Sequence, residues 1–97
     1  MSRQITDEII RAFMNGTNKK VSNSEVKADC TGVRMYLFGN LIAERIGNRI
    51  RITMAGYPTH TTRERLNGIP GVSLTQKNYR QYLNGKEIKT DEFYAIN

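Results

Sequence analysis

The chain has few of the residues on which several classes of protein depend. Of its 97 residues, one is cysteine (Cys30), one is histidine (His60) and none is tryptophan. A lone cysteine forms no intrachain disulfide, and one cysteine with one histidine falls short of the four ligands of a structural zinc site. We therefore expect no metal centre, and nothing in the sequence requires a cofactor.

Long apolar runs are also missing. The longest, residues 35–38 and 41–43, are far shorter than a membrane span. The first ten residues lack the apolar central region of a signal peptide, so the expected location is the cytoplasm, with no membrane partner. An apolar fraction of 38% and a charged fraction of 25% are typical of a soluble globular protein, and the length predicts one domain over residues 1–97.

Positive charge is concentrated in the middle of the chain. The formal net charge is +6, and residues 31–80 hold eight cationic residues, seven of them arginine, against Glu44 and Glu64. Arginine forks bind phosphates and carboxylates bidentately, so this block is a candidate recognition surface. The alternative is that the excess charge only keeps a small domain soluble.

Local signals predict an α+β fold in four parts. An N-terminal helix is expected within residues 1–16, with Thr6 as its N-cap and Ile9, Ile10, Phe13 and Met14 on its apolar face. A three-stranded antiparallel meander is expected over residues 33–54, a short helix over 61–67, and C-terminal strands that extend the sheet over 72–97. Residues 17–32 fit either a strand or a loop.

The predicted meander contains two Gly-Asn pairs, at residues 39–40 and 47–48, each suited to a two-residue hairpin turn. Such turns fix the register and predict Leu37 opposite Ile42, Met35 opposite Glu44 and Ala43 opposite Ile52. The predicted core face carries seven residues from the three strands, namely Tyr36, Phe38, Leu41, Ala43, Ile50, Ile52 and Met54. The opposite face is partly apolar and partly basic, and is expected to be covered by the N-terminal helix or to serve as an interaction surface.

Residues 61–67 match a helix that begins with a capping box. Thr61 would accept from the Glu64 amide, and Asn67 and Gly68 would end the helix in the left-handed conformation. A catalytic threonine would need His60 as its base, and no acidic residue lies shortly upstream to orient the imidazole. We therefore expect no enzyme here, but an anion-binding helix terminus. The candidate binding residues are Arg49, Arg51, Tyr57, His60, Arg63 and Arg65.

Two tyrosines of the C-terminal strands have a second interpretation. Tyr79 and Tyr82 alternate with Lys77 and Arg80, which would suit the stacking of single-stranded bases if the rings are exposed. Aromatic residues in strands more often belong to the core.

Three segments, "LFGNLIA", "AGYPTHTTRERLNGI" and "TQKNYRQYLNG", together resemble a family of small proteins encoded by bacteriophages and prophages. The shared pattern is a Gly-Asn hairpin, an Ala-Gly-aromatic step, Thr-x-Thr-Thr and Arg-Leu-Asn, and it covers residues 33–85. Tyr57 stands where the family pattern has tryptophan. The resemblance implies a phage accessory protein and brings no activity with it.

Two functional hypotheses follow. The first is a non-enzymatic phage protein, acting in the host cytoplasm, that binds and inhibits a host protein or nucleoprotein complex, such as a CRISPR-type defence complex. The second is a nucleic-acid-binding module whose central arginines contact phosphates. The sequence leaves the oligomeric state open.

Overall fold

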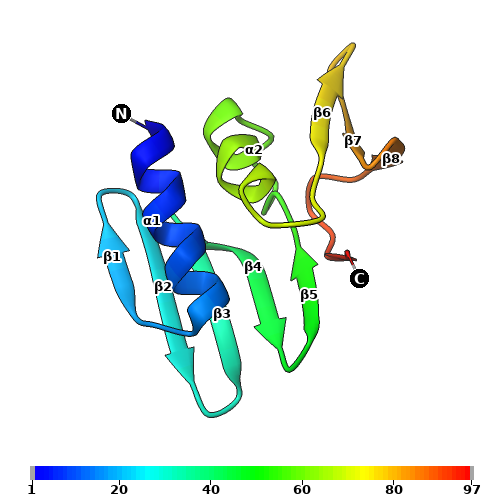
Figure 1. Ribbon diagram of the computed structural model, residues 1–97. Helices are drawn as coiled ribbons and strands as arrows, with labels where there is room; N and C mark the ends of the chain where they lie inside the picture. Colours follow the sequence, from blue (N-terminus) through cyan, green and yellow to red (C-terminus); the bar gives the residue numbers. More distant parts are fainter. Residues whose placement is uncertain (1, 97) are drawn as a thin grey trace.

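A computed structural model describes residues 2–96, with side chains from Ile5 onward (Figure 1). Two helices and nine strands are found in these residues. In chain order they are α1 (Ser2–Asn15), β1 (Lys19–Val21), β2 (Ser24–Asp29), β3 (Gly32–Leu37), β4 (Asn40–Ile46), β5 (Arg49–Ile52), α2 (His60–Asn67), β6 (Leu74–Lys77), β7 (Arg80–Leu83), β8 (Lys86–Ile88) and β9 (Tyr94–Ala95).

The strands form two antiparallel sheets, and the α+β class is confirmed. The larger sheet has the order β1-β2-β3-β4-β5-β9, and the smaller has the order β6-β7-β8. The expectation that the C-terminal strands extend the central sheet is therefore wrong for β6, β7 and β8, and only β9 joins it. Residues 17–32, which the sequence left open, supply β1 and β2.

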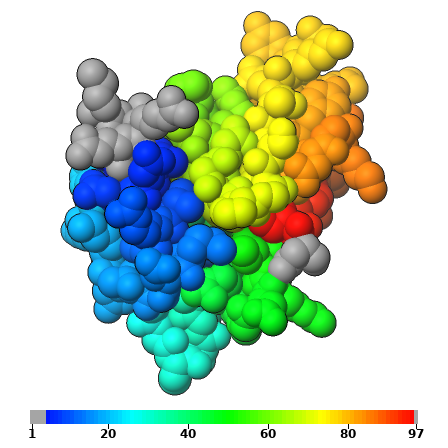
Figure 2. Space-filling model, viewed as in Figure 1, coloured from blue at the N-terminus to red at the C-terminus, as the bar shows by residue number. Residues whose placement is uncertain are grey.

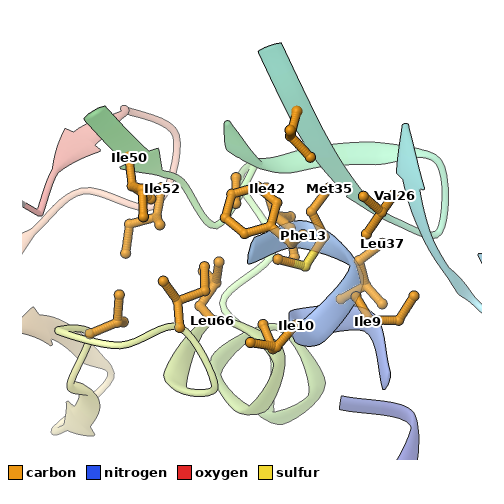
Figure 3. Packing of buried hydrophobic residues seen from close by; sticks show 14 of the residues in the cluster. Ile9, Ile10, Phe13, Val26, Met35, Leu37, Ile42, Ile50, Ile52 and Leu66 are labelled. Carbon is orange, nitrogen blue, oxygen red and sulfur yellow. The ribbon is translucent and has the colours of Figure 1, made fainter. Parts of the chain in front are cut away.

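Both helices lie on one face of the six-stranded sheet, with α1 across β1, β2 and β3 and α2 beside it (Figure 1). The apolar side chains between helices and sheet make up the core (Figure 3). Ile9, Ile10 and Phe13 of α1 are buried there as expected, whereas Met14 is partly exposed. On the other face of the sheet, no helix lies among the described residues.

The helix α1 begins at Ser2, five residues before the start that a Thr6 N-cap predicts. Thr6 is thus not its N-cap but lies inside the helix, buried, and its hydroxyl accepts a hydrogen bond of 2.6 Å from Arg65 Nη1. The sequence offered Thr6 as a cap because threonine before an acidic pair is a common helix start. The contact with α2 gives this hydroxyl a different role.

One predicted hairpin register is confirmed and the other is wrong. In the β4–β5 hairpin Ala43 lies opposite Ile52, as expected from the Gly47-Asn48 turn. In the β3–β4 hairpin the turn residues are Phe38 and Gly39, both with positive φ, and a bulge then shifts the pairing so that Met35 lies opposite Ala43.

Because of this shift, the side chains of β3 that point into the core are those that the sequence had assigned to the outer face. Three residues of β3 that were assigned to the outer face are buried under α1, namely Val33, Met35 and Leu37. Tyr36 and Phe38, predicted for the core, point away from it, and Phe38 is 69% exposed. The β5 residues Ile50 and Ile52 are buried as predicted.

Gly68 follows α2, but it does not end the helix in the left-handed conformation that the sequence predicts. Its φ is −72°. A Cβ built on Gly68 would lie 2.7 Å from Ile10 Cγ1 and 3.0 Å from Thr6 Cγ2. Glycine here lets the end of α2 approach α1 closely, which holds the two helices together over the sheet.

Candidate functional site

Arg65, one of the six predicted binding residues, lies inside the protein. Only 2% of it is exposed, and its burial lowers the pKa of the guanidinium. Nε donates to Ser24 Oγ of β2 at 3.0 Å, and Nη1 donates to Thr6 Oγ1 of α1. Arg65 therefore joins α2, α1 and β2, and its assignment to an exposed patch is wrong.

Arg63 lies one turn from the start of α2 and binds the smaller sheet. Its Nη1 donates to Gln76 Oε1 at 2.7 Å, to Gln81 Oε1 at 3.2 Å and to the carbonyl oxygen of Pro58 at 3.1 Å. This arginine braces the β6–β7 hairpin against α2.

Arg49 and Arg51 lie on the outer, helix-free face of the six-stranded sheet. Arg51 forms an ion pair with Glu44, and its guanidinium stacks over the Phe93 ring at 5.1 Å. Glu44 also pairs with Arg34 at 3.3 Å, so the carboxylate is enclosed between two arginines. A depression of about 500 Å³ is lined by Glu44, Ile46, Arg49, Arg51 and Ala95.

His60 lies on the surface at the start of α2, apart from buried Arg65 and from the outer sheet face. It is exposed at the first position of α2 and lines a polar hollow of about 580 Å³ together with Thr6, Asp7, Arg63, Glu64, Asn67, Gly68 and Leu74. The structure thus divides the arginines of the candidate recognition surface between the outer sheet face, the protein interior and the α2 surface. A single continuous patch of Arg49, Arg51, Arg63 and Arg65 does not exist.

Most cations of the central basic block already have partners. The six with contacts are Arg34, Arg45, Arg51, Arg63, Arg65 and Arg80. Arg49 and Lys77 are exposed, and neither takes part in an ion pair among the described side chains. Arg45 and Arg63 donate to neutral acceptors, so hydrogen bonds hold these two guanidiniums in place without neutralising their charge.

The remaining predicted residue, Tyr57, borders an apolar pocket of about 300 Å³. The pocket lies between the β3–β4 turn and the segment that enters α2. Its floor is formed by the buried side chains of Leu37, Ile42 and Met54. The other lining residues are Phe38, Asn40, Ala55, Tyr57, Thr59 and Thr62.

Two exposed aromatic side chains stand at the border of this pocket. Phe38 is 69% exposed and Tyr57 is 57% exposed. Phe38 has a φ of 52°, a left-handed conformation that an aromatic residue rarely adopts. Its amide donates to the carbonyl oxygen of Asn23 at 2.8 Å, which fixes the turn against the β1–β2 connection. An exposed apolar ring at a strained position suggests a functional role for Phe38.

A second turn places Tyr57. Ala55 and Gly56 both have positive φ, and the Tyr57 amide donates to the Met54 carbonyl oxygen at 2.8 Å. The chain therefore reverses directly after β5 and turns the Tyr57 side chain to the surface. Sequence reasoning missed Phe38 because it was assigned to the core; the signal available was an aromatic residue directly before the turn glycine.

One side of the pocket is formed by Thr59 and Thr62 at the start of α2, and the helix is capped by Thr59 rather than by Thr61. Thr59 is the N-cap of α2, its Oγ1 accepts from the Thr62 amide at 3.2 Å, and the Thr59 and Thr62 hydroxyls lie 2.9 Å apart. The predicted capping box of Thr61 and Glu64 is wrong. Starting at His60 places Thr62, Arg65 and Leu66 on the buried side of the helix, and tertiary packing decides among the three threonines.

Replacing Thr59 with alanine is therefore expected to lower the free energy of unfolding by about 1 kcal/mol through loss of the cap. The matched control is Thr61→Ala, which removes an identical side chain two residues later and should have a smaller effect. Urea denaturation of the two variants measures the difference. An equal or larger loss for Thr61→Ala would contradict the observed start of α2.

The lining of the pocket is apolar with a few uncharged polar side chains. Among its described lining residues there is no carboxylate, histidine or amine, and the two threonine hydroxyls bond each other. No group of three or more His, Cys, Asp or Glu side chains placed to hold a metal ion is found in the described residues. Within residues 2–96, neither helix is long and apolar enough to cross a membrane.

The chain was compared with curated proteins, solved structures and protein-family models. No curated protein and no solved structure matches the chain. The model of the Kyanoviridae Gp96 protein family matches residues 2–97, which is nearly the whole sequence. This confirms the resemblance to small phage-encoded proteins, and the chain belongs to the Kyanoviridae Gp96 protein family.

Proposed function

We propose that this phage protein is a non-enzymatic accessory protein that binds and inhibits a host protein in the cytoplasm of the infected cell. The contact point is the apolar pocket between Phe38 and Tyr57. The observation that carries the proposal is the pair of exposed aromatic rings beside a floor of buried aliphatic side chains. Aromatic anchors in desolvated pockets supply most of the binding energy in protein interfaces.

The size of the pocket supports a protein partner. A volume of about 300 Å³ lies at the lower limit of small-molecule pockets and accommodates one large apolar side chain. The hydroxyls of Thr59 and Thr62 and the amide of Asn40 offer polar contacts at the edge. A leucine or aromatic side chain on a partner loop fits this combination.

The class of partner that we favour is a host defence complex, such as a CRISPR-type nucleoprotein. Its support is that the protein belongs to a phage family, is small, and has two exposed aromatic rings beside an apolar pocket. The second candidate function is direct binding of nucleic acid through the central arginines. The observation in its favour is the depression shared by Arg49 and Arg51 on the uncovered sheet face.

The pocket is tested with Phe38→Asn and Tyr57→Ser. Phe38→Asn creates an Asn-Gly turn, which favours the left-handed conformation, so the free energy of unfolding should stay the same or rise. The double variant is expected to bind the partner at least about tenfold more weakly, because each ring contributes a hot-spot contact. The measurement is retention of a host protein from lysate treated with nuclease, followed by titration of the isolated partner.

The control is Arg49→Glu, a reversal on the outer sheet face that should leave retention of a protein partner unchanged. Loss of all partners after nuclease, with sensitivity to Arg49→Glu, would favour the nucleic-acid alternative. If the double variant retains the partner as the unchanged protein does, the pocket is not the contact point. Identification of the retained protein by mass spectrometry decides whether it belongs to a defence complex.

A further inference from the structure

A second exposed aromatic element lies at the tip of the β6–β7 hairpin. The turn residues are Asn78 and Tyr79, with φ values of 52° and 66°, and Tyr79 is 94% exposed. The hairpin projects from the body of the protein beside α2 (Figures 1 and 2). The Tyr79 ring therefore stands in solvent at the end of a protruding ribbon.

The β7–β8 hairpin has a similar turn in which glycine takes the place of the exposed tyrosine. The β7–β8 turn is made by Asn84 and Gly85, with φ values of 52° and 89°. Both turns begin with an asparagine in the left-handed region, but glycine adopts the second position without strain and tyrosine does not. Tyr79 thus carries backbone strain that glycine would remove, and its exposed ring contributes little packing in return.

The base of this hairpin is held rigidly. Arg63 Nη1 donates to Gln76 Oε1 and Gln81 Oε1, and Gln81 Nε2 donates to Gln76 Oε1 at 3.2 Å. Gln81 is buried, and Leu74 and Leu83 are anchored in the core. The protein therefore presents Tyr79 from a braced support, and binding at the tip loses little conformational freedom.

Two cations accompany the ring. Lys77 and Arg80 lie opposite each other in the register, directly before and after the turn, and both are exposed. Arg80 makes one ion pair, with exposed Glu87 at 3.7 Å, and a phosphate could compete with a pair so open to solvent. Tyr82, in contrast, is half-buried in β7 between Thr75 and Glu87 and is less accessible for stacking.

We propose that the tip of the β6–β7 hairpin binds single-stranded nucleic acid. A base stacks on the Tyr79 ring, and Lys77 and Arg80 contact the adjacent phosphates. Base stacking on an aromatic ring is tolerant of sequence, and cations beside it follow the backbone. The convex tip offers a flat ring and charges but no apolar hollow, which suits a base better than a protein side chain. This inference is independent of the pocket between Phe38 and Tyr57.

The test uses the whole protein and fluorescently labelled oligo-dT and oligo-U of about 12 nucleotides, followed by fluorescence anisotropy. Tyr79→Gly is expected to raise the melting temperature, because it relieves the strained turn, and to weaken binding at least about tenfold. Tyr79→Phe keeps the ring and should bind within about twofold of the unchanged protein. Lys77→Ala should reduce the slope of log affinity against log salt by about 0.7.

The control is Tyr57→Ser, which removes an exposed aromatic ring elsewhere and should leave oligonucleotide affinity unchanged. The proposal is overturned if the protein shows no saturable binding in about 50 mM salt, where electrostatic binding is strong. It is also overturned if Tyr79→Gly binds as well as the unchanged protein, or if that variant loses a host protein while keeping its oligonucleotide affinity. None of these outcomes bears on the Phe38 pocket, whose partner is measured separately.

Discussion

Arg65→Ala is expected to lower the free energy of unfolding by about 3–5 kcal/mol, the largest effect that we predict for this protein. The guanidinium is buried, and its hydrogen bonds reach Thr6 on α1 and Ser24 on β2. Alanine would leave both hydroxyls without this donor and would open a cavity between α2 and the sheet. Since small proteins are stable by about 5–15 kcal/mol, the variant is expected to lose a large share of its stability.

Arg49→Ala is the matched control for this prediction. Arg49 is an arginine of the same central block that is exposed on the outer sheet face, so its truncation should change stability by less than about 0.5 kcal/mol. Circular dichroism during urea titration measures both variants. Similar losses at the two positions would mean that Arg65 does not hold the helices to the sheet.

Gly32→Ala is expected to cost about 2–3 kcal/mol, the second largest effect. Gly32 begins β3, and a Cβ built on it would lie 2.7 Å from the backbone oxygen of Arg45 and 3.0 Å from Ile46 Cγ1. A backbone atom within a sheet cannot move aside as a side-chain end can. The strand would have to shift at the point where the Gly32 amide donates to Asp29 Oδ1.

Gly32 also has a positive φ, 153°, so alanine is strained at Gly32 and at the control position Gly47, and only Gly32→Ala adds a close contact. Gly47 has a φ of 60°, and no atom lies within 4 Å of a Cβ built on it, so Gly47→Ala incurs only conformational strain of about 1–2 kcal/mol. The melting temperature of Gly32→Ala should therefore fall further than that of Gly47→Ala. A smaller loss for Gly32→Ala would show that β3 and β4 separate at little cost.

Where a structural feature depends only on residues close in sequence, the sequence alone predicted it correctly. The apolar spacing of Ile9, Ile10 and Phe13 predicts the buried face of α1, and all three are buried. Gly47 and Asn48 fix the β4–β5 register, because a two-residue turn leaves no freedom in pairing. The α+β class follows from such signals alone.

Where the sequence contains two or more possible turns or helix caps, contacts with the rest of the protein determine which one forms. The sequence offers the turns Phe38-Gly39 and Gly39-Asn40, and the first forms because, with the bulge, it brings Val33, Met35 and Leu37 under α1. Likewise, three threonines could cap α2, and Thr59 does so, because its hydroxyl satisfies both the amide and the hydroxyl of buried Thr62.

Which residues belong to the candidate site could be predicted from the sequence even less than the turns and caps. Arginine is usually exposed, so Arg65 was assigned to the surface, but two hydroxyls distant in sequence make its burial favourable. Phe38 was assigned to the core, yet the register shift in β3 turns it outward beside Tyr57. By itself, the sequence determined the helices, most of the strands and one hairpin register. Only the tertiary structure decided which polar side chains are buried and which aromatic rings are exposed, since both depend on contacts between residues far apart in the chain.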